Sequence, residues 1–244
     1  LQKNQAVNAL HVMERIKGEI PAGYQHDIAF LRGQIYLATG RFQDAVKVLQ
    51  DMQSEKKYAG FTSYNLGIAQ IQNNEESAGF NTLDKFGQLA SNDHAVLALK
   101  DKANLALAFQ YEKKGIAKQA KTYLSRVRLD GPFSNKALLK AGWMHVSLGD
   151  YERALVPWTL LHERQTNNAS VQEALLAVPY AYGKLNVHGK AALLYGQAMK
   201  NLGEEINRLE TSVKSIHEGK FLKAVLREEK NTDRLWLYNL RDLP

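Results

Sequence analysis

Small side chains recur in pairs along this chain, and the two members of each pair lie twelve residues apart. The pairs are Gly33 and Ala45, Gly67 and Gly79, Ala108 and Ala120, Gly142 and Ala154, and Pro179 and Ala191. The first members are separated by 34, 41, 34 and 37 residues, so the unit repeats with two short insertions. Repetition at this period is typical of stacked helical hairpins in which small residues let two helices cross closely.

A turn residue and a bulky residue accompany every pair. The turn residues are Gly40, Asn73-Asn74, Gly115, Gly149 and Asn186, and the bulky residues are Leu49, Leu83, Leu124, Trp158 and Tyr195. The stretch 135–161 shows the pattern most clearly, with helical spacing of apolar residues on both sides of Gly149-Asp150. Glycine and asparagine suit a tight turn between two helices. The sequence therefore predicts five helical hairpins.

These hairpins resemble the tetratricopeptide repeat (TPR), a helix–turn–helix unit of 34 residues. The family pattern matches Gly33, Tyr36, Gly40, Phe42, Ala45 and Leu49, and again Gly142, Gly149, Tyr151, Ala154 and Trp158. It is broken by Pro179 in the last unit, and by Gln70 and His145 where the family has tyrosine. The resemblance implies an all-α, right-handed superhelix of TPR helix-turn-helix repeats with a helical C-terminal extension. The segment 126–143 also resembles uncharacterised TPR proteins of the bacterial envelope.

The domain organisation follows from this register. Residues 1–20 are expected to form the second helix of a truncated upstream repeat, residues 26–200 five TPR-like hairpins, and residues 201–244 a C-terminal helical cap and tail. Asp93 and Ser134 are expected to cap the helices that follow them. Pro157 and Pro179 are expected to kink theirs. The apolar tail 235–240 either docks on the last unit or continues into a further domain.

Composition limits the environment only loosely. The chain lacks cysteine, which excludes disulfides and thiolate metal sites and suits a cytosolic or a periplasmic address. The sequence has no apolar run of about 18 residues, so no membrane-spanning segment is expected. The net charge of +7 permits an anionic partner. The chain begins at Leu1 within a helical pattern and is expected to be a fragment or a mature form; a bacterial periplasmic or envelope-associated location is favoured, with the cytoplasm as the alternative.

The TPR register implies a concave groove formed by the first helix of each hairpin. Its positions are unusually apolar and aromatic, and lysines line the rim, which favours a peptide with apolar anchors and some acidic character. The candidate groove residues are Phe30, Tyr64, Ile68, Lys102, Phe109, Lys136, Leu139, Trp143, Tyr180 and Lys184. Tyr64, Phe109, Trp143 and Tyr180 are the expected anchors. The alternative occupant is the protein's own C-terminal tail.

We therefore expect a non-catalytic scaffold or adaptor that binds a protein or peptide partner without a cofactor. The seven histidines have no metal-ligand spacing, and no phosphate loop or nucleophile motif is present. One alternative is an accessory module of a larger envelope or enzyme complex. Another is binding of nucleic acid or anionic lipid by the basic run 113–128. This is disfavoured because most of its basic side chains fall on the convex, outward positions of a hairpin, where a solvated helix face is expected. Self-association through the open ends of the stack is a further possibility.

Overall fold

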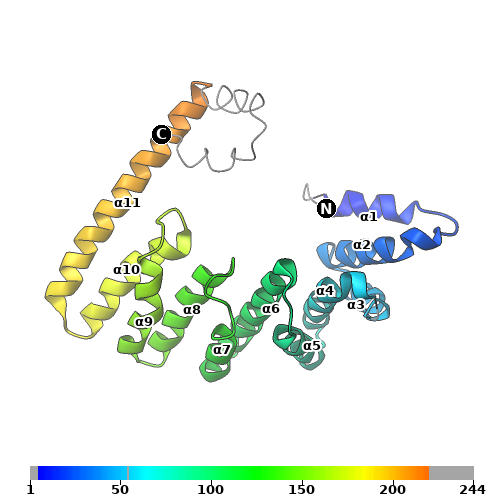
Figure 1. Cartoon of the computed structure of the whole chain (residues 1–244), viewed down its shortest axis with the longest axis horizontal. Coiled ribbons are helices and arrows are strands. Elements are labelled where there is room, and N and C mark those ends of the chain that lie inside the picture. The colour runs from blue at the N-terminus through cyan, green and yellow to red at the C-terminus, as the bar shows by residue number, and fades with distance from the viewer. Residues whose placement is uncertain (1–4, 54, 220–244) are drawn as a thin grey trace. The chain divides into compact units, whose positions relative to one another are not determined.

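The computed structural model describes residues 5–53 and 55–219 and shows only helices there (Figure 1). The α-helices are α1 (Ala6–Glu14), α2 (Gln25–Ala38), α3 (Phe42–Asp51), α4 (Ala59–Gln72), α5 (Glu76–Gln88), α6 (His94–Lys113), α7 (Ala117–Leu124), α8 (Ser134–Ser147), α9 (Tyr151–His162), α10 (Ala169–Lys184) and α11 (His188–His217). Two short 3-10 helices, η1 (Ala22–Tyr24) and η2 (Lys56–Tyr58), precede α2 and α4. The all-α fold class is confirmed. No helix among the described residues is both long and apolar enough to cross a membrane.

The chain divides into two compact units, residues 1–148 and residues 149–244. In the first unit, neighbouring helices from α1 to α8 pack against one another in chain order. In the second unit, α10 packs against both α9 and α11. Four of the predicted hairpins are each contained in a single unit. The hairpins α2/α3, α4/α5 and α6/α7 lie in the first unit, and α10/α11 lies in the second. The boundary between the units falls inside the predicted hairpin 135–161, between α8 and α9.

Each predicted turn contains one residue with the backbone geometry that ends a helix abruptly. Gly40, Gly115 and Gly149 have φ of +76°, +72° and +75°, and Asn74 and Asn186 have φ of +63° and +61°. Glycine adopts this left-handed region without steric cost, and asparagine tolerates it better than most residues. In four of these turns, the residue that follows the positive-φ residue donates its backbone N–H to the carbonyl five residues back, as in a Schellman motif. These bonds run from Arg41 to Tyr36, Glu75 to Gln70, Ile116 to Tyr111 and Val187 to Tyr182.

The small residues lie where the two helices of a hairpin cross. A Cβ atom added to Gly67 would come within 2.6 Å of Leu83 Cγ. One added to Gly79 would lie 2.7 Å from the carbonyl oxygen of Gly67. The bulky Leu83 is fully buried against this crossing, and Leu49 occupies the same place beside Gly33. The twelve-residue spacing therefore reflects close packing of two backbones, with a large side chain filling the space beside them.

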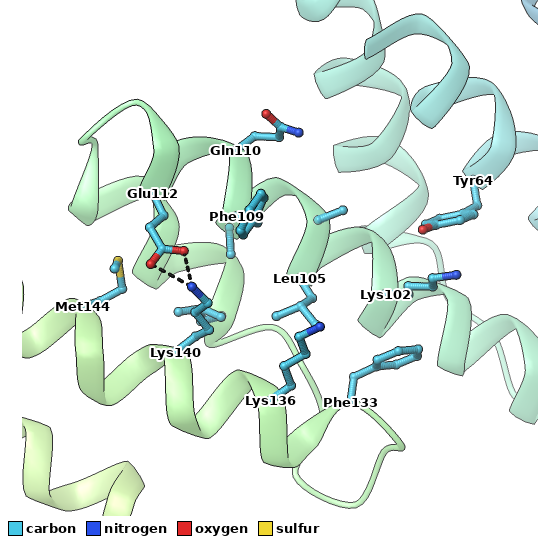
Figure 2. A pocket seen from close by; sticks show the side chains of 13 residues that line it. Tyr64, Lys102, Leu105, Phe109, Gln110, Glu112, Phe133, Lys136, Lys140 and Met144 are labelled. Atoms are coloured by element: carbon cyan, nitrogen blue, oxygen red, sulfur yellow. Dashed lines mark hydrogen bonds and ion pairs between the residues drawn. The ribbon is translucent and has the colours of Figure 1, made fainter. Parts of the chain in front are cut away.

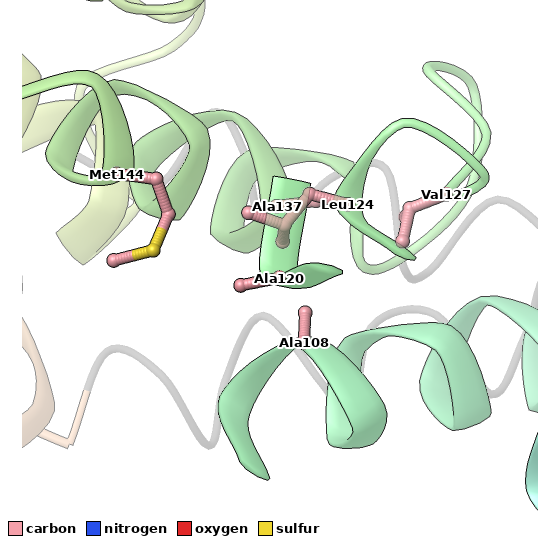
Figure 3. Close-up of a cluster of buried hydrophobic side chains, with 6 residues drawn as sticks. All are labelled: Ala108, Ala120, Leu124, Val127, Ala137 and Met144. Carbon is pink, nitrogen blue, oxygen red and sulfur yellow. The ribbon is translucent and has the colours of Figure 1, made fainter. Parts of the chain in front are cut away.

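The core of the first unit is a series of local clusters. One joins α3 to α4 around Leu49 and Leu66, and a second joins α5 to α6 around Phe86 and Leu107. A third joins α6, α7 and α8 and consists of Ala108, Ala120, Leu124, Val127, Ala137 and Met144 (Figure 3). Each cluster involves neighbouring helices, as in a repeat protein whose stability comes from nearest-neighbour interfaces.

The helix ends and the prolines are partly as expected. Asp93 caps α6, because its Oδ1 accepts bonds of 2.8 and 2.9 Å from the N–H groups of Ala95 and Val96. The expected cap at Ser134 is wrong: Ser134 is the first residue of α8, and the preceding Phe133 makes no side-chain cap. α9 and α10 continue through Pro157 and Pro179, and kinks there stay a prediction. The apolar tail 235–240 lies outside the described residues.

Candidate functional site

A pocket of about 340 Å³ opens on the first unit between α4, α6 and α8 (Figure 2). Its lining combines apolar and aromatic side chains with three lysines and one carboxylate. The lining residues are Tyr64, Lys102, Leu105, Ala106, Ala108, Phe109, Gln110, Glu112, Leu124, Phe133, Lys136, Lys140 and Met144. This volume lies at the lower end of the range for ligand pockets and suits one or two side chains of a partner.

Helical periodicity explains which residues reach the pocket. α6 presents Lys102, Leu105, Phe109 and Glu112, which are three or four residues apart and therefore share one face. α8 presents Lys136, Lys140 and Met144 at intervals of four residues. Of these four, Lys102 and Phe109 are among the groove residues that the TPR register predicts.

The pocket carries an excess of positive charge. Lys140 Nζ contacts both carboxylate oxygens of Glu112, at 2.9 and 2.7 Å, and lies 5.4 Å from the centre of the Phe109 ring. Lys102 Nζ lies 5.0 Å from the centre of the Tyr64 ring. Among the described residues, neither Lys102 nor Lys136 forms an ion pair with a carboxylate. Two lysines of the pocket are therefore available to an acidic partner.

The aromatic groups offer an apolar surface beside these charges. Phe109 is 54% exposed, which is high for so large an apolar ring. Burial raises the pKa of Tyr64 to about 12. Its phenol, like that of an ordinary tyrosine, is protonated at neutral pH and can donate a hydrogen bond. Figure 2 shows Tyr64 and Lys102 on one side of the pocket and Lys136 and Lys140 projecting from α8. The site therefore combines an exposed aromatic ring with ammonium groups a short distance away.

Four of the ten predicted groove residues come together in this pocket: Tyr64, Lys102, Phe109 and Lys136. The other six lie elsewhere. Phe30 stacks on Tyr58 with ring centres 4.6 Å apart, and Ile68 packs on the core between α5 and α6. Leu139 is buried and Trp143 is half-buried, and neither lines the pocket. Tyr180 and Lys184 belong to the second unit, where the lysine Nζ lies 5.6 Å from the centre of the tyrosine ring.

Several contributors to the pocket are not among the ten predicted groove residues, and three of them lie on α8 or directly before it. On α8, the row that lines the pocket runs through Lys140 and Met144, one residue beyond the predicted Leu139 and Trp143. Lys140 is not among the ten candidates, and its four-residue spacing from Lys136 is the signal that could have linked the two. Phe133 precedes α8 in a loop, where helical periodicity gives no information about the direction of a side chain.

The basic run 113–128 is partly neutralised by neighbouring helices. Lys114 pairs with Glu76, Arg126 with Asp84, and Arg128 with Asp101, at 2.6, 2.6 and 2.7 Å. Asp101 is only 2% exposed and also accepts the backbone N–H of Arg128, so this pair ties α6 to the loop before α8. Three of the six basic side chains in the run therefore hold the repeat together.

The geometry gives no positive sign of a metal centre. Within residues 5–53 and 55–219, no group of three or more histidine or acidic side chains is arranged to hold a metal ion. The chemistry that the described site supports is recognition, through an apolar ring, a phenol and lysine ammonium groups.

Comparisons with known proteins relate the chain to helical-repeat structures. No protein-family model matches the sequence, and no curated protein matches it either. A crystal structure of the MamA protein matches with a TM-score of 0.55 and 15% identity, over 76% of this chain and 96% of that one. MamA from AMB-1 matches with a TM-score of 0.53 and 17% identity, over 73% and 92% of the two chains. At these identities the likeness concerns the fold alone, and it confirms a TPR-like helical-repeat fold.

Proposed function

We propose that this chain is a non-catalytic protein-interaction module that binds a partner segment in the pocket between α4, α6 and α8. TPR-like folds are typical of protein–protein interaction scaffolds, whose stacked repeats offer extended binding surfaces. The observation that carries the proposal is the exposed Phe109 ring, with the ammonium groups of Lys102 and Lys136 lining the same pocket. A segment with an apolar side chain next to a carboxylate fits this arrangement.

A partner segment adds its interactions to groups that are already in place. Covering the exposed part of Phe109 removes apolar surface from water, and aromatic anchors in such pockets commonly contribute more than 1 kcal/mol to binding. A carboxylate between Lys102 and Lys136 gains charge-assisted hydrogen bonds. Because Lys140 is held by Glu112, the pocket wall is ordered before binding, which reduces the entropic cost of association.

The experiment begins with peptides selected from a random display library on the immobilised full chain. Selected peptides are expected to pair an aromatic or aliphatic residue with an acidic one. Calorimetry on the best peptide should show a loss of more than about 1 kcal/mol for Phe109→Ala and for Lys136→Glu. Leu89→Ala, which removes another exposed apolar side chain of the first unit outside this pocket, should leave the affinity unchanged.

Equal binding by Phe109→Ala and the unsubstituted chain would contradict this site. A wider groove in the first unit, with Trp143 as a further anchor, is tested by Trp143→Ala. This substitution should weaken partner binding by more than about 1 kcal/mol without loss of helicity if the groove extends to that residue.

The competing partner is an anionic surface such as nucleic acid or lipid. The dependence of the binding affinity on salt concentration distinguishes it from the proposed partner segment. Binding through the basic run 113–128 would weaken steeply as salt rises, because counterions are released. Binding anchored on Phe109 should change much less. The ion pairs of Lys114, Arg126 and Arg128 leave fewer free charges for that alternative.

A further inference from the structure

The second half of α11 carries a stripe of exposed apolar side chains. The stripe consists of Ile206, Leu209, Val213 and Ile216, each more than half exposed. Successive members are three or four residues apart, which places them on one face of the helix. Together with Glu210, Lys214 and His217 they line a hollow on this surface. A continuous apolar surface of this kind indicates a site of contact.

The length of α11 explains why the stripe has no cover from α10. α10 has 16 residues and α11 has 30, so at about 1.5 Å per residue the helices are roughly 24 and 45 Å long. The two run antiparallel from the turn at residues 185–187, and α11 extends past the start of α10 by 14 residues (30 − 16) (Figure 1). Among the described residues, α10 is the helix against which α11 packs. An isolated helical segment of this length is only marginally stable in water, so a covering partner would stabilise it.

We propose that the segment 220–244 of the same chain, which lies outside the described residues, packs on this stripe. Gly219 has φ of +70° and donates its N–H to the carbonyl of Ile216, so α11 ends directly beside the stripe. The segment that follows begins with Phe221, Leu222, Val225 and Leu226. These residues are separated by one, three and one positions, a pattern typical of the apolar face of an amphipathic helix. In the sequence, the apolar residues of the segment thus follow directly after those of the stripe.

The effective concentration of a tethered segment favours residues 220–244 over a second copy of the chain as the group that covers the stripe. A segment joined by a short connection acts at an effective concentration of about millimolar, whereas a second copy acts at its actual concentration.

Thiol labelling of the full-length chain tests the proposal, because the chain has no cysteine of its own. Val213→Cys places a thiol in the stripe, and Thr211→Cys places one on another face of the same helix. Both side chains are exposed among the described residues, so an uncovered stripe predicts equal rates with a water-soluble maleimide. The proposal predicts that the thiol at position 213 reacts at least about tenfold more slowly, at every protein concentration.

Substitutions in the segment then identify the cover. Val225→Asp with Leu226→Asp should restore the rate at position 213 to that at position 211, while far-UV circular dichroism shows that the helices remain. Phe221→Asp is a second variant with the same expected result. The proposal would be overturned if the thiols at positions 211 and 213 reacted at equal rates in chains with an unsubstituted segment 220–244. It would also be overturned if the thiol at position 213 reacted slowly and the aspartate substitutions left that rate unchanged. Protection that grows with protein concentration, with disulfide-linked dimers of the position 213 variant, would assign the stripe to a second copy instead.

Discussion

The helix crossing in α4/α5 allows one substitution to be predicted in both sign and size. Replacing a helical glycine by alanine stabilises an exposed helix by about 1 kcal/mol, because alanine has the higher helix propensity. At Gly79 the added Cβ would lie 2.7 Å from the carbonyl oxygen of Gly67 and 2.9 Å from the backbone nitrogen of Ile71. These are backbone atoms, so α4 and α5 must move apart to relieve the contact. Overpacking of a core costs about 1–3 kcal/mol, and the upper end applies where backbone is displaced.

Gly79→Ala is therefore expected to destabilise the first unit by about 2 kcal/mol, the difference between a cost of about 3 and a gain of about 1. With a urea dependence of about 2 kcal/mol per molar, the unfolding midpoint should fall by about 1 M. The matched control is Gly196→Ala in α11, where a Cβ has no atom within 4 Å and the midpoint of its unit should rise. Urea unfolding followed by circular dichroism at 222 nm measures both. If the two substitutions shifted the midpoint in the same direction, the close crossing of α4 and α5 would be refuted.

Three further predictions follow from side chains that hold the repeats or titrate within them. Asp101→Ala leaves the Arg128 guanidinium without its carboxylate and should cost about 2–3 kcal/mol, at the lower end for a buried pair because the arginine is 30% exposed; urea unfolding measures it. Asp93→Ala removes the cap of α6 and should cost about 1 kcal/mol in the same assay. The raised pKa of Tyr64 means that the folded state holds this proton more tightly than the unfolded state, so stability should fall as pH rises from 10 towards 12. Tyr64→Phe should flatten that decline, and an unchanged slope would contradict the burial of the phenol.

The hairpin architecture was predictable because its determinants are local in the sequence. A turn requires one residue that tolerates positive φ, and Gly40 and Asn74 meet this need without help from distant residues. A close crossing requires small side chains at matched positions on two helices joined by that turn. Spacing along the chain reports both conditions. The hairpins α2/α3, α4/α5, α6/α7 and α10/α11 therefore have their helices and turns where the spacing predicts them.

The pocket depended on contacts between hairpins, which spacing does not report. Tyr64 and Phe109 meet in one pocket although 45 residues separate them, whereas Phe30 stacks on Tyr58. On α8, packing against α6 and α7 determines that the row through Lys140 lines the pocket. One residue along a helix corresponds to a rotation of about 100°, so a small error in register selects a different face. The sequence by itself determined that these helices form hairpins and where they turn. Only the tertiary structure decided which side chains share a surface, because that depends on the angle and rotation at which successive helices pack.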